Sequence, residues 1–151
     1  MKSLHYILLE LPSKVEYALL ALLEMAGQAD GKTPVTVNEI TAKHPIPERY
    51  LEQILANLRR GGLLKSQRGA KGGYILAKAP EEITLLDVVT SIEGDREALD
   101  HGDDTTIEMQ LIRETWQKAN LAAQAVLEQH TLQSLYQERE AYRQKGLMYY
   151  I

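Results

Sequence analysis

A proline-stiffened turn, an amphipathic helix and a glycine-rich hairpin follow one another within residues 44–78. Pro45 and Pro47 restrict the backbone ahead of the helix. The pair Gly61-Gly62 ends the helix, because glycine tolerates the left-handed conformation found at helix ends. Two short apolar runs then flank the segment 68–73, Arg-Gly-Ala-Lys-Gly-Gly, which predicts a hairpin with a basic tip. A helix followed by such a hairpin is typical of a helix–turn–helix with a β wing.

The helix expected over 47–60 has an apolar face and a polar face. Apolar side chains recur at helical spacing and predict one buried stripe, made of Tyr50, Leu51, Ile54, Leu55 and Leu58. The opposite face carries Arg49, Glu52, Gln53, Ala56 and Arg60. Short polar side chains of this kind recognise base edges in the major groove of DNA. An ordinary solvated helix has the same pattern, so the helix alone leaves both interpretations open.

The segment 49–78 is strongly basic although the whole chain is acidic. It holds seven Lys or Arg and one acidic residue, Glu52, which gives a net charge of +6 against −4 for the chain. Neutralisation of phosphates drives most nucleic-acid affinity, so this basic segment (49–78) suggests a polyanionic partner. The alternative is a charged hairpin beside a solvated helix face.

Two capping boxes and a third capping residue, Thr84, predict where further helices begin. The paired residues are Ser13 with Glu16, Thr36 with Glu39, and Thr84 with Asp87. The first helix runs to about Ala29, and the second is short and completes helix–turn–helix spacing ahead of the turn at 44–47. The third has its apolar face at Leu86, Val89 and Ile92 and ends at Gly94. A last, more polar helix is expected over 131–145.

A long helix is predicted over 105–130. Its apolar residues alternate in steps of three and four and form a seam (the α-helical stripe Met109, Ile112, Trp116, Ala119, Ala123 and Val126). This seam could pack against the chain's own first helix, against a second copy, or against both. We therefore expect a mainly α fold with a small β wing. The expected divisions are a winged helix–turn–helix domain (1–93, with 1–10 as an extension), an acidic loop (94–104) and a dimerisation helix with a C-terminal helix and tail (105–151).

Composition excludes several classes of site. The chain has 151 residues and no cysteine, which rules out disulfides, thiolate nucleophiles and cysteine-held zinc or iron–sulfur centres. It contains no G-x-S-x-G nucleophile motif, no P-loop and no histidine-based metal motif. We therefore expect that the protein is not an enzyme. The apolar run within residues 1–10 is too short for a signal peptide or a membrane span. The expected compartment is the cytoplasm, with no membrane partner.

Several motifs in a fixed order resemble the Rrf-two family of bacterial winged-helix regulators. They are Ser13-Lys-x-x-Tyr17-Ala-Leu, Tyr50-Leu-Glu-Gln-Ile-Leu-x-x-Leu-Arg, Gly62-Leu-Leu-Lys-Ser-x-Arg68-Gly, Gly72-Gly-Tyr-x-Leu-Ala and Glu82-Ile-Thr-Leu-x-Asp-Val-Val. The resemblance is dense over 11–93 and thinner beyond. It implies a homodimer with a long crossing helix, a recognition helix at 47–60 and a wing that enters the minor groove.

The resemblance also implies roles for individual residues. Carried over by position, Glu52 and Gln53 meet base edges in the major groove, and Arg68 at the wing tip sits in the minor groove. Contacts to the DNA backbone position the protein on the duplex without recognising its base sequence. The resemblance implies that they are made by Lys14, Arg49, Tyr50, Arg59, Arg60 and Lys71. For Tyr50, packing in the core is the expectation that we favour.

The chain departs from the resemblance at its sensor. Sensing members of that family carry three cysteines in the loop before the long helix, whereas the loop 94–104 here has none. An iron–sulfur cluster needs such soft ligands, so we expect no cofactor. A divalent-metal site made of Glu16, His101, Asp103 and Asp104 is an alternative, although helix capping and the helix dipole explain the same acids.

The leading hypothesis is a dimeric, sequence-specific transcription regulator, a repressor type, that binds a pseudo-palindromic operator in double-stranded DNA. Its signal would be an effector protein, a small ligand at the dimer junction or a divalent metal, or the regulator would have no signal. The competing hypothesis is a winged-helix module that binds proteins and no longer uses its wing for DNA.

Overall fold

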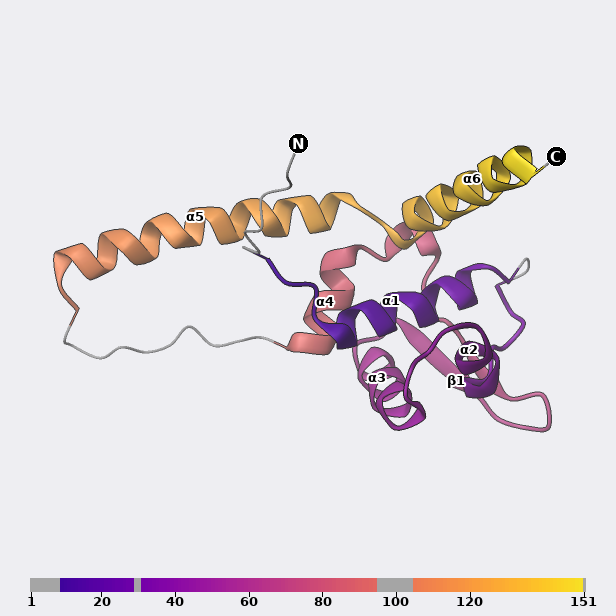
Figure 1. Cartoon of the computed structure of the whole chain (residues 1–151). Helices are drawn as coiled ribbons and strands as arrows, with labels where there is room; N and C mark the ends of the chain where they lie inside the picture. The colour runs from indigo at the N-terminus through magenta and orange to yellow at the C-terminus, as the bar shows by residue number, and fades with distance from the viewer. Residues whose placement is uncertain (1–8, 29–30, 95–104, 151) are drawn as a thin grey trace.

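The structure is a computed structural model, and it describes residues 9–28, 31–94 and 105–150. These ranges form a mainly helical fold with a two-stranded antiparallel sheet, as predicted (Figure 1). The elements in chain order are α1 (Ser13–Ala26), α2 (Val37–Lys43), α3 (Glu48–Arg60), β1 (Leu64–Gln67), β2 (Gly73–Leu76), a 3₁₀ helix η1 (Pro80–Glu82), α4 (Leu85–Glu93), α5 (Ile107–Gln129) and α6 (Leu132–Tyr150).

Helices α1, α2 and α3 form a helix–turn–helix around an aliphatic core. The hydroxyl of Thr36 caps α2 by accepting a hydrogen bond of 3.2 Å from the N–H of Glu39. Removal of each large aliphatic side chain from water contributes about 1.5–3 kcal/mol. The core is made of Ala18, Ala21, Leu22, Met25, Val35, Ile40, Ile46, Leu51, Ile54, Leu55, Leu58, Leu63, Leu64, Ile83, Val88 and Leu132.

The start of α1 differs from the prediction. Ser13 is the first helical residue, and Pro12 occupies the cap position without a side-chain hydrogen bond. The N–H of Glu16 donates to the carbonyl of Pro12 at 3.1 Å. Because the backbone already satisfies this donor, the predicted capping box of Ser13 and Glu16 is wrong. The helix also ends at Ala26, earlier than expected.

The predicted hairpin is confirmed. Strands β1 and β2 pair in antiparallel register, with Leu64 opposite Leu76. Strand β2 also pairs with the segment before α2, since Val35 and Tyr74 exchange two backbone hydrogen bonds of 2.9 Å. Gly73 makes this approach possible, because a Cβ there would lie 2.7 Å from the carbonyl oxygen of Val35. The base of the wing is therefore fixed to the helix–turn–helix.

Helix α4 follows the wing and begins at the predicted cap, Thr84, which forms a full capping box with Asp87. The N–H of Asp87 donates to the Thr84 hydroxyl, and the N–H of Thr84 donates to the Asp87 carboxylate, both at 3.0 Å. Its buried residue is Val88. The predicted inner face is therefore wrong in part, since α4 turns Val88 toward α1 and α3 and leaves Leu86 only partly covered.

The C-terminal helix α6 packs back onto the helix–turn–helix. It contacts α1 and η1, and Leu132 in its first turn is fully buried in the same core. Two backbone hydrogen bonds join its start to the η1–α4 connection, from Leu85 N–H to the carbonyl of His130 at 2.9 Å and from Leu132 N–H to that of Ile83 at 2.8 Å. The chain therefore returns to its first core after α5.

Helix α5 lies along the side of the molecule opposite α3 and the wing. Figure 1 shows its N-terminal end extending well beyond α1 and α4, while its other end leads into α6. None of the residues of α5, all of which the structure describes, is buried. This 23-residue helix contacts α4, but much of its apolar surface is left uncovered by the other described elements.

Candidate nucleic-acid interface

The outer face of α3 is fully open to solvent. Arg49, Glu52, Gln53, Arg59 and Arg60 are all exposed, as the two-faced pattern predicted. The first turns of the helix line a surface hollow of about 630 Å³, formed by Pro47, Arg49, Tyr50, Glu52 and Gln53. The two candidate base-reading side chains therefore share one accessible surface.

Tyr50 does not pack in the core. Its side chain is 49% exposed, and it lines the hollow beside Glu52 and Gln53. The helix rotates by about 100° per residue, so Leu51 takes the inward direction and Tyr50 lies on the flank. The expectation of a buried Tyr50 is wrong, and its hydroxyl is free to reach the solvent side.

The wing tip carries cations into solvent. The connection between β1 and β2 runs from Arg68 to Gly72, and a hydrogen bond of 2.9 Å from the Gly72 N–H to the carbonyl of Gly69 closes its turn. Arg68 and Lys71 are exposed there. In Figure 1, α3 and the wing loop both lie on the side away from α5. One face of the molecule thus presents a polar helix and a basic loop.

The cations of this face have few internal partners. Among the described residues, Arg49, Arg59, Arg68 and Lys71 make no ion pair, and Arg60 donates to the side chain of Asn57. Lys14 is exposed in the first turn of α1. Guanidinium and ammonium groups without a carboxylate partner keep their charge available for external phosphates.

A buried acid stabilises the turn that leads into α3. The carboxylate of Glu24 on α1 is 8% exposed and accepts hydrogen bonds of 3.0 Å from Lys43 Nζ and His44 Nε2. Arg139 of α6 lies 3.8 Å from the same carboxylate and stacks over the ring of Tyr136. The Glu24 cluster (Glu24, Lys43, His44 and Arg139) therefore joins three helices at the entrance to the recognition helix.

The pKa of Glu24 reflects two opposing causes. Burial raises the pKa of the carboxyl, but the hydrogen bonds and charges of Lys43 and His44 outweigh burial, so the pKa lies below its usual 4.5. Sequence reasoning missed this residue and Arg139. The available signal was an acid inside an otherwise apolar helix, since buried acids need partners.

The predicted seam of α5 is exposed in the single chain. Trp116 is 71% exposed, and Met109, Ile112, Ala119 and Val126 also face solvent, whereas Ala123 is half-buried. The chain's own first helix does not cover this stripe. Among the described residues, nothing buries it.

The candidate metal ligands are not brought together by the described residues. Glu16 is exposed on α1, and His101, Asp103 and Asp104 lie outside the described ranges. In the described parts of the chain, no three His, Cys, Asp or Glu side chains form a group that could hold a metal ion. No described helix is long and apolar enough to cross a membrane.

Comparison with known proteins places this geometry in a family. The family model Rrf2, described as an iron-dependent transcriptional regulator, matches residues 11–138. The regulator CymR of Bacillus subtilis is 33% identical over 143 residues, which are 95% of this chain and all of CymR. An rrf2-like regulator of Rhodobacter capsulatus is 43% identical over 83 residues, 54% of this chain and 55% of that protein.

Solved structures agree with the sequence matches. The structure of CymR, described as the global cysteine regulator of B. subtilis, has a TM-score of 0.72 and 33% identity over 87% of this chain and 98% of that one. The IscR structure of T. potens has a TM-score of 0.73 and 32% identity, and the match covers 90% of this chain and 92% of that one. The resemblance inferred from the motifs is confirmed. The chain belongs to the Rrf2 family, whose members are helix–turn–helix transcriptional regulators rather than enzymes.

Proposed function

We propose that this chain is a sequence-specific regulator that binds a pseudo-palindromic operator as a homodimer. The observation that carries the proposal is the face formed by α3 and the wing. It combines an exposed polar helix with cations that have no ion pair among the described residues. A DNA duplex offers both the groove for the helix and the phosphates for the cations.

The proposed contacts divide into two groups. Glu52 and Gln53 would read base edges from the middle of α3, and Arg68 would enter the minor groove from the wing tip. Contacts to phosphates would come from Lys14, Arg49, Tyr50, Arg59, Arg60 and Lys71. The exposure of Tyr50 supports this second role, since a phenolic hydroxyl in the hollow can donate to a phosphate oxygen.

The homodimer is proposed from α5. A second copy would bury the seam around Trp116 and place two recognition helices on either side of a two-fold axis. Half-sites about one helical turn of DNA apart fit such a pair. We place the protein in the cytoplasm, where bacterial operators are.

The proposed regulator works without an iron–sulfur cluster. The family description refers to iron, but the chain has no cysteine to bind a cluster, and the described residues hold no alternative group of ligands. The signal would then come from an effector protein or a small ligand.

Footprinting of the metal-stripped protein on the DNA upstream of its own gene is the direct test, with fluorescence anisotropy on the protected site. Arg68→Ala is expected to weaken binding about ten- to a hundredfold, because a charge-assisted hydrogen bond contributes about 1.5–3 kcal/mol. The slope of log K against log salt should fall by about one.

Lys145→Ala is the matched control for Arg68→Ala. It removes one exposed cation near the end of α6, away from α3 and the wing. Equal losses in the two variants would contradict the wing assignment. Absence of any protected site, with folded protein, would favour a protein-binding module instead.

The homodimer predicts a particle of twice the 17.0 kDa chain mass in sedimentation equilibrium. Trp116→Glu should weaken dimerisation at least about thirtyfold, since a buried Trp at an interface contributes about 2 kcal/mol or more. The control Gln117→Glu adds the same charge at the neighbouring exposed position. It should leave the particle mass at that of the wild-type dimer. A monomeric wild-type protein at micromolar concentration would refute the proposal.

A further inference from the structure

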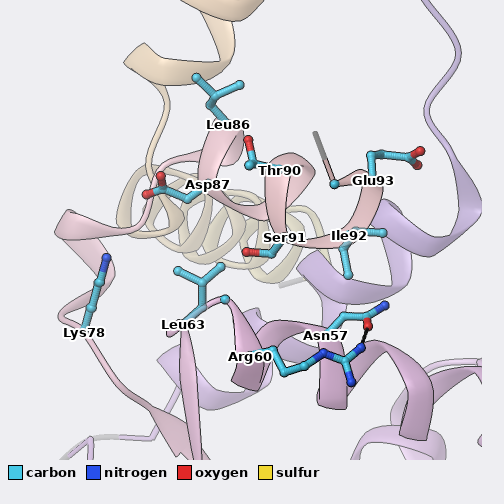
Figure 2. A pocket seen from close by; sticks show the side chains of 12 residues that line it. Asn57, Arg60, Leu63, Lys78, Leu86, Asp87, Thr90, Ser91, Ile92 and Glu93 are labelled. Atoms are coloured by element: carbon cyan, nitrogen blue, oxygen red, sulfur yellow. Dashed lines mark hydrogen bonds between the residues drawn. The ribbon is translucent and has the colours of Figure 1, made fainter. Parts of the chain in front are cut away.

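Helix α3 is held in different ways at its two ends. Figure 2 shows Asn57 and Arg60 of its last turns below Ser91 of α4, with a hydrogen bond between Asn57 and Arg60. The two helices lie close together there, because a Cβ on Gly61 would be 2.9 Å from the Cβ of Ser91. The first turns of α3 carry the candidate base-reading residues. Their placement depends on how the turn 44–47 is held.

An apolar and a polar anchor hold that turn. The apolar anchor is Ile46, which is 5% exposed and belongs to the core. The polar anchor is the Glu24 carboxylate, whose two oxygens accept separate hydrogen bonds of 3.0 Å, one from Lys43 and one from His44. The carbonyl of His44 in turn accepts a hydrogen bond of 2.8 Å from the Ile46 N–H. A shift of the His44 ring would therefore move the backbone that leads into α3.

Helix α6 reaches the same carboxylate through Arg139. Its Nη1 lies 3.8 Å from Glu24 Oε1, the oxygen that also bonds His44, and its Nε lies 3.4 Å from the carboxylate of Glu140 on its own helix. The Arg139 side chain is 22% exposed. Gly27 leaves room for it, since a Cβ there would be 3.2 Å from Nη2. The guanidinium is therefore held between α6 and the end of α1.

Helix α6 does not belong to the candidate DNA face. Figure 1 shows it on the side of α1 away from α3 and the wing loop. Energetic coupling between distant parts of a protein can pass through contiguous hydrogen bonds and ion pairs. Arg139, Glu24 and His44 form such a sequence of contacts, which begins on α6 and ends at the turn before α3.

We propose that Glu24 is a positioning residue for DNA recognition and that, through Arg139, it couples the docking of α6 to the placement of the first turns of α3. The inference rests on the proposed function, since it concerns how α3 is presented to an operator. Without the carboxylate, Ile46 remains as an anchor, but apolar contact has no preferred direction. The angle at which the turn enters α3 is then free to vary. Operator affinity therefore depends on a helix that lies away from the DNA.

Glu24→Gln separates positioning from charge, because the two predict opposite changes in DNA affinity. Loss of a carboxylate should by charge alone tighten binding to a polyanion. Misplacement of α3 should instead weaken operator binding at least about tenfold, the effect of losing one good base contact, and leave binding to a duplex of unrelated sequence undiminished. Fluorescence anisotropy on both duplexes measures this. Glu138→Gln removes the same charge from an exposed position of α6 and should not weaken operator binding.

Arg139→Ala tests the coupling from α6. It should weaken operator binding about threefold, because it removes one ion pair, and Lys145→Ala, an exposed cation of the same helix, should not. If Arg139 acts through Glu24, the double variant should bind the operator no more weakly than Glu24→Gln alone. Melting curves show that each variant is folded at the temperature of the measurement. Operator binding by Glu24→Gln that equals or exceeds that of the wild type would overturn the proposal.

Hydrogen–deuterium exchange of the full chain without DNA gives a second readout, which also serves if Glu24→Gln does not fold. Amides of residues 44–51 should exchange at least about threefold faster in Arg139→Ala than in the wild type, whereas amides of the wing (64–76) should not change. Unchanged exchange over 44–51 in Arg139→Ala would show that α6 does not reach the turn and would refute the coupling. Failure of the proposed function appears differently, as a wild-type protein that binds no operator while the exchange result stands.

Discussion

Replacing Leu132 by alanine is expected to lower the free energy of unfolding by about 2–5 kcal/mol. Leu132 is fully buried, and it carries the start of α6 into the core formed by the helix–turn–helix. Truncation removes apolar contacts and leaves a cavity that two backbone hydrogen bonds, at His130 and Leu132, hold open. Urea unfolding followed by circular dichroism at pH 7 measures the change.

Leu11→Ala is the control for this change. Leu11 lies just before α1 and is 60% exposed, so its truncation should alter stability by no more than about 0.5 kcal/mol. If Leu132→Ala unfolds at the same urea concentration as the wild type, then α6 does not share the core. A loss in the expected range would show that the segment after α5 stabilises the domain before it.

The elements that sequence reasoning predicted well depend on local signals. The hairpin follows from glycines between two apolar runs, and the start of α4 follows from Thr84 and Asp87 at the spacing that lets each cap the other. The buried stripe of α3 follows from helical spacing at Leu51, Leu55 and Leu58. These features involve residues close in the chain, where backbone geometry alone decides the outcome.

The errors arose where two residues competed for one position. Pro12 satisfies the Glu16 N–H with its carbonyl, so the hydroxyl of Ser13 has no capping role. Tyr50 and Leu51 are both apolar neighbours, but helical rotation lets only one face the core. Pattern alone cannot rank such alternatives, because the packing of other helices decides between them.

Contacts between residues far apart in the chain left no pattern in the sequence from which they could be predicted. The helix at the C-terminus was expected, but not its packing on α1, nor the approach of Arg139 to Glu24. For the candidate site, exposure of Glu52, Gln53 and Arg68 agrees with the sequence pattern, while their contacts to DNA stay predictions.

Replacing Glu24 by alanine is expected to lower the free energy of unfolding by about 1.5–3 kcal/mol at pH 7, the usual contribution of hydrogen bonds to a charged group, since Lys43 is itself mostly exposed. His44 and Arg139 are both largely covered and would lose their common carboxylate. The turn before α3 and the docking of α6 should loosen together. Glu16→Ala, an exposed acid on the same helix, should change stability by no more than about 0.5 kcal/mol.

The difference in the free energy of unfolding between wild type and Glu24→Ala should become smaller as the pH falls. The pKa of Glu24 is lowered in the folded chain from its usual 4.5, so the unfolded chain takes up the proton first as pH falls. The stabilisation is therefore fully present above about pH 5 and is lost as pH falls through the folded-state pKa. Urea unfolding of both proteins at pH 7, 5, 4 and 3 measures the trend, and a difference that stays constant down to pH 3 would show that the charge of Glu24 does not hold the three helices together.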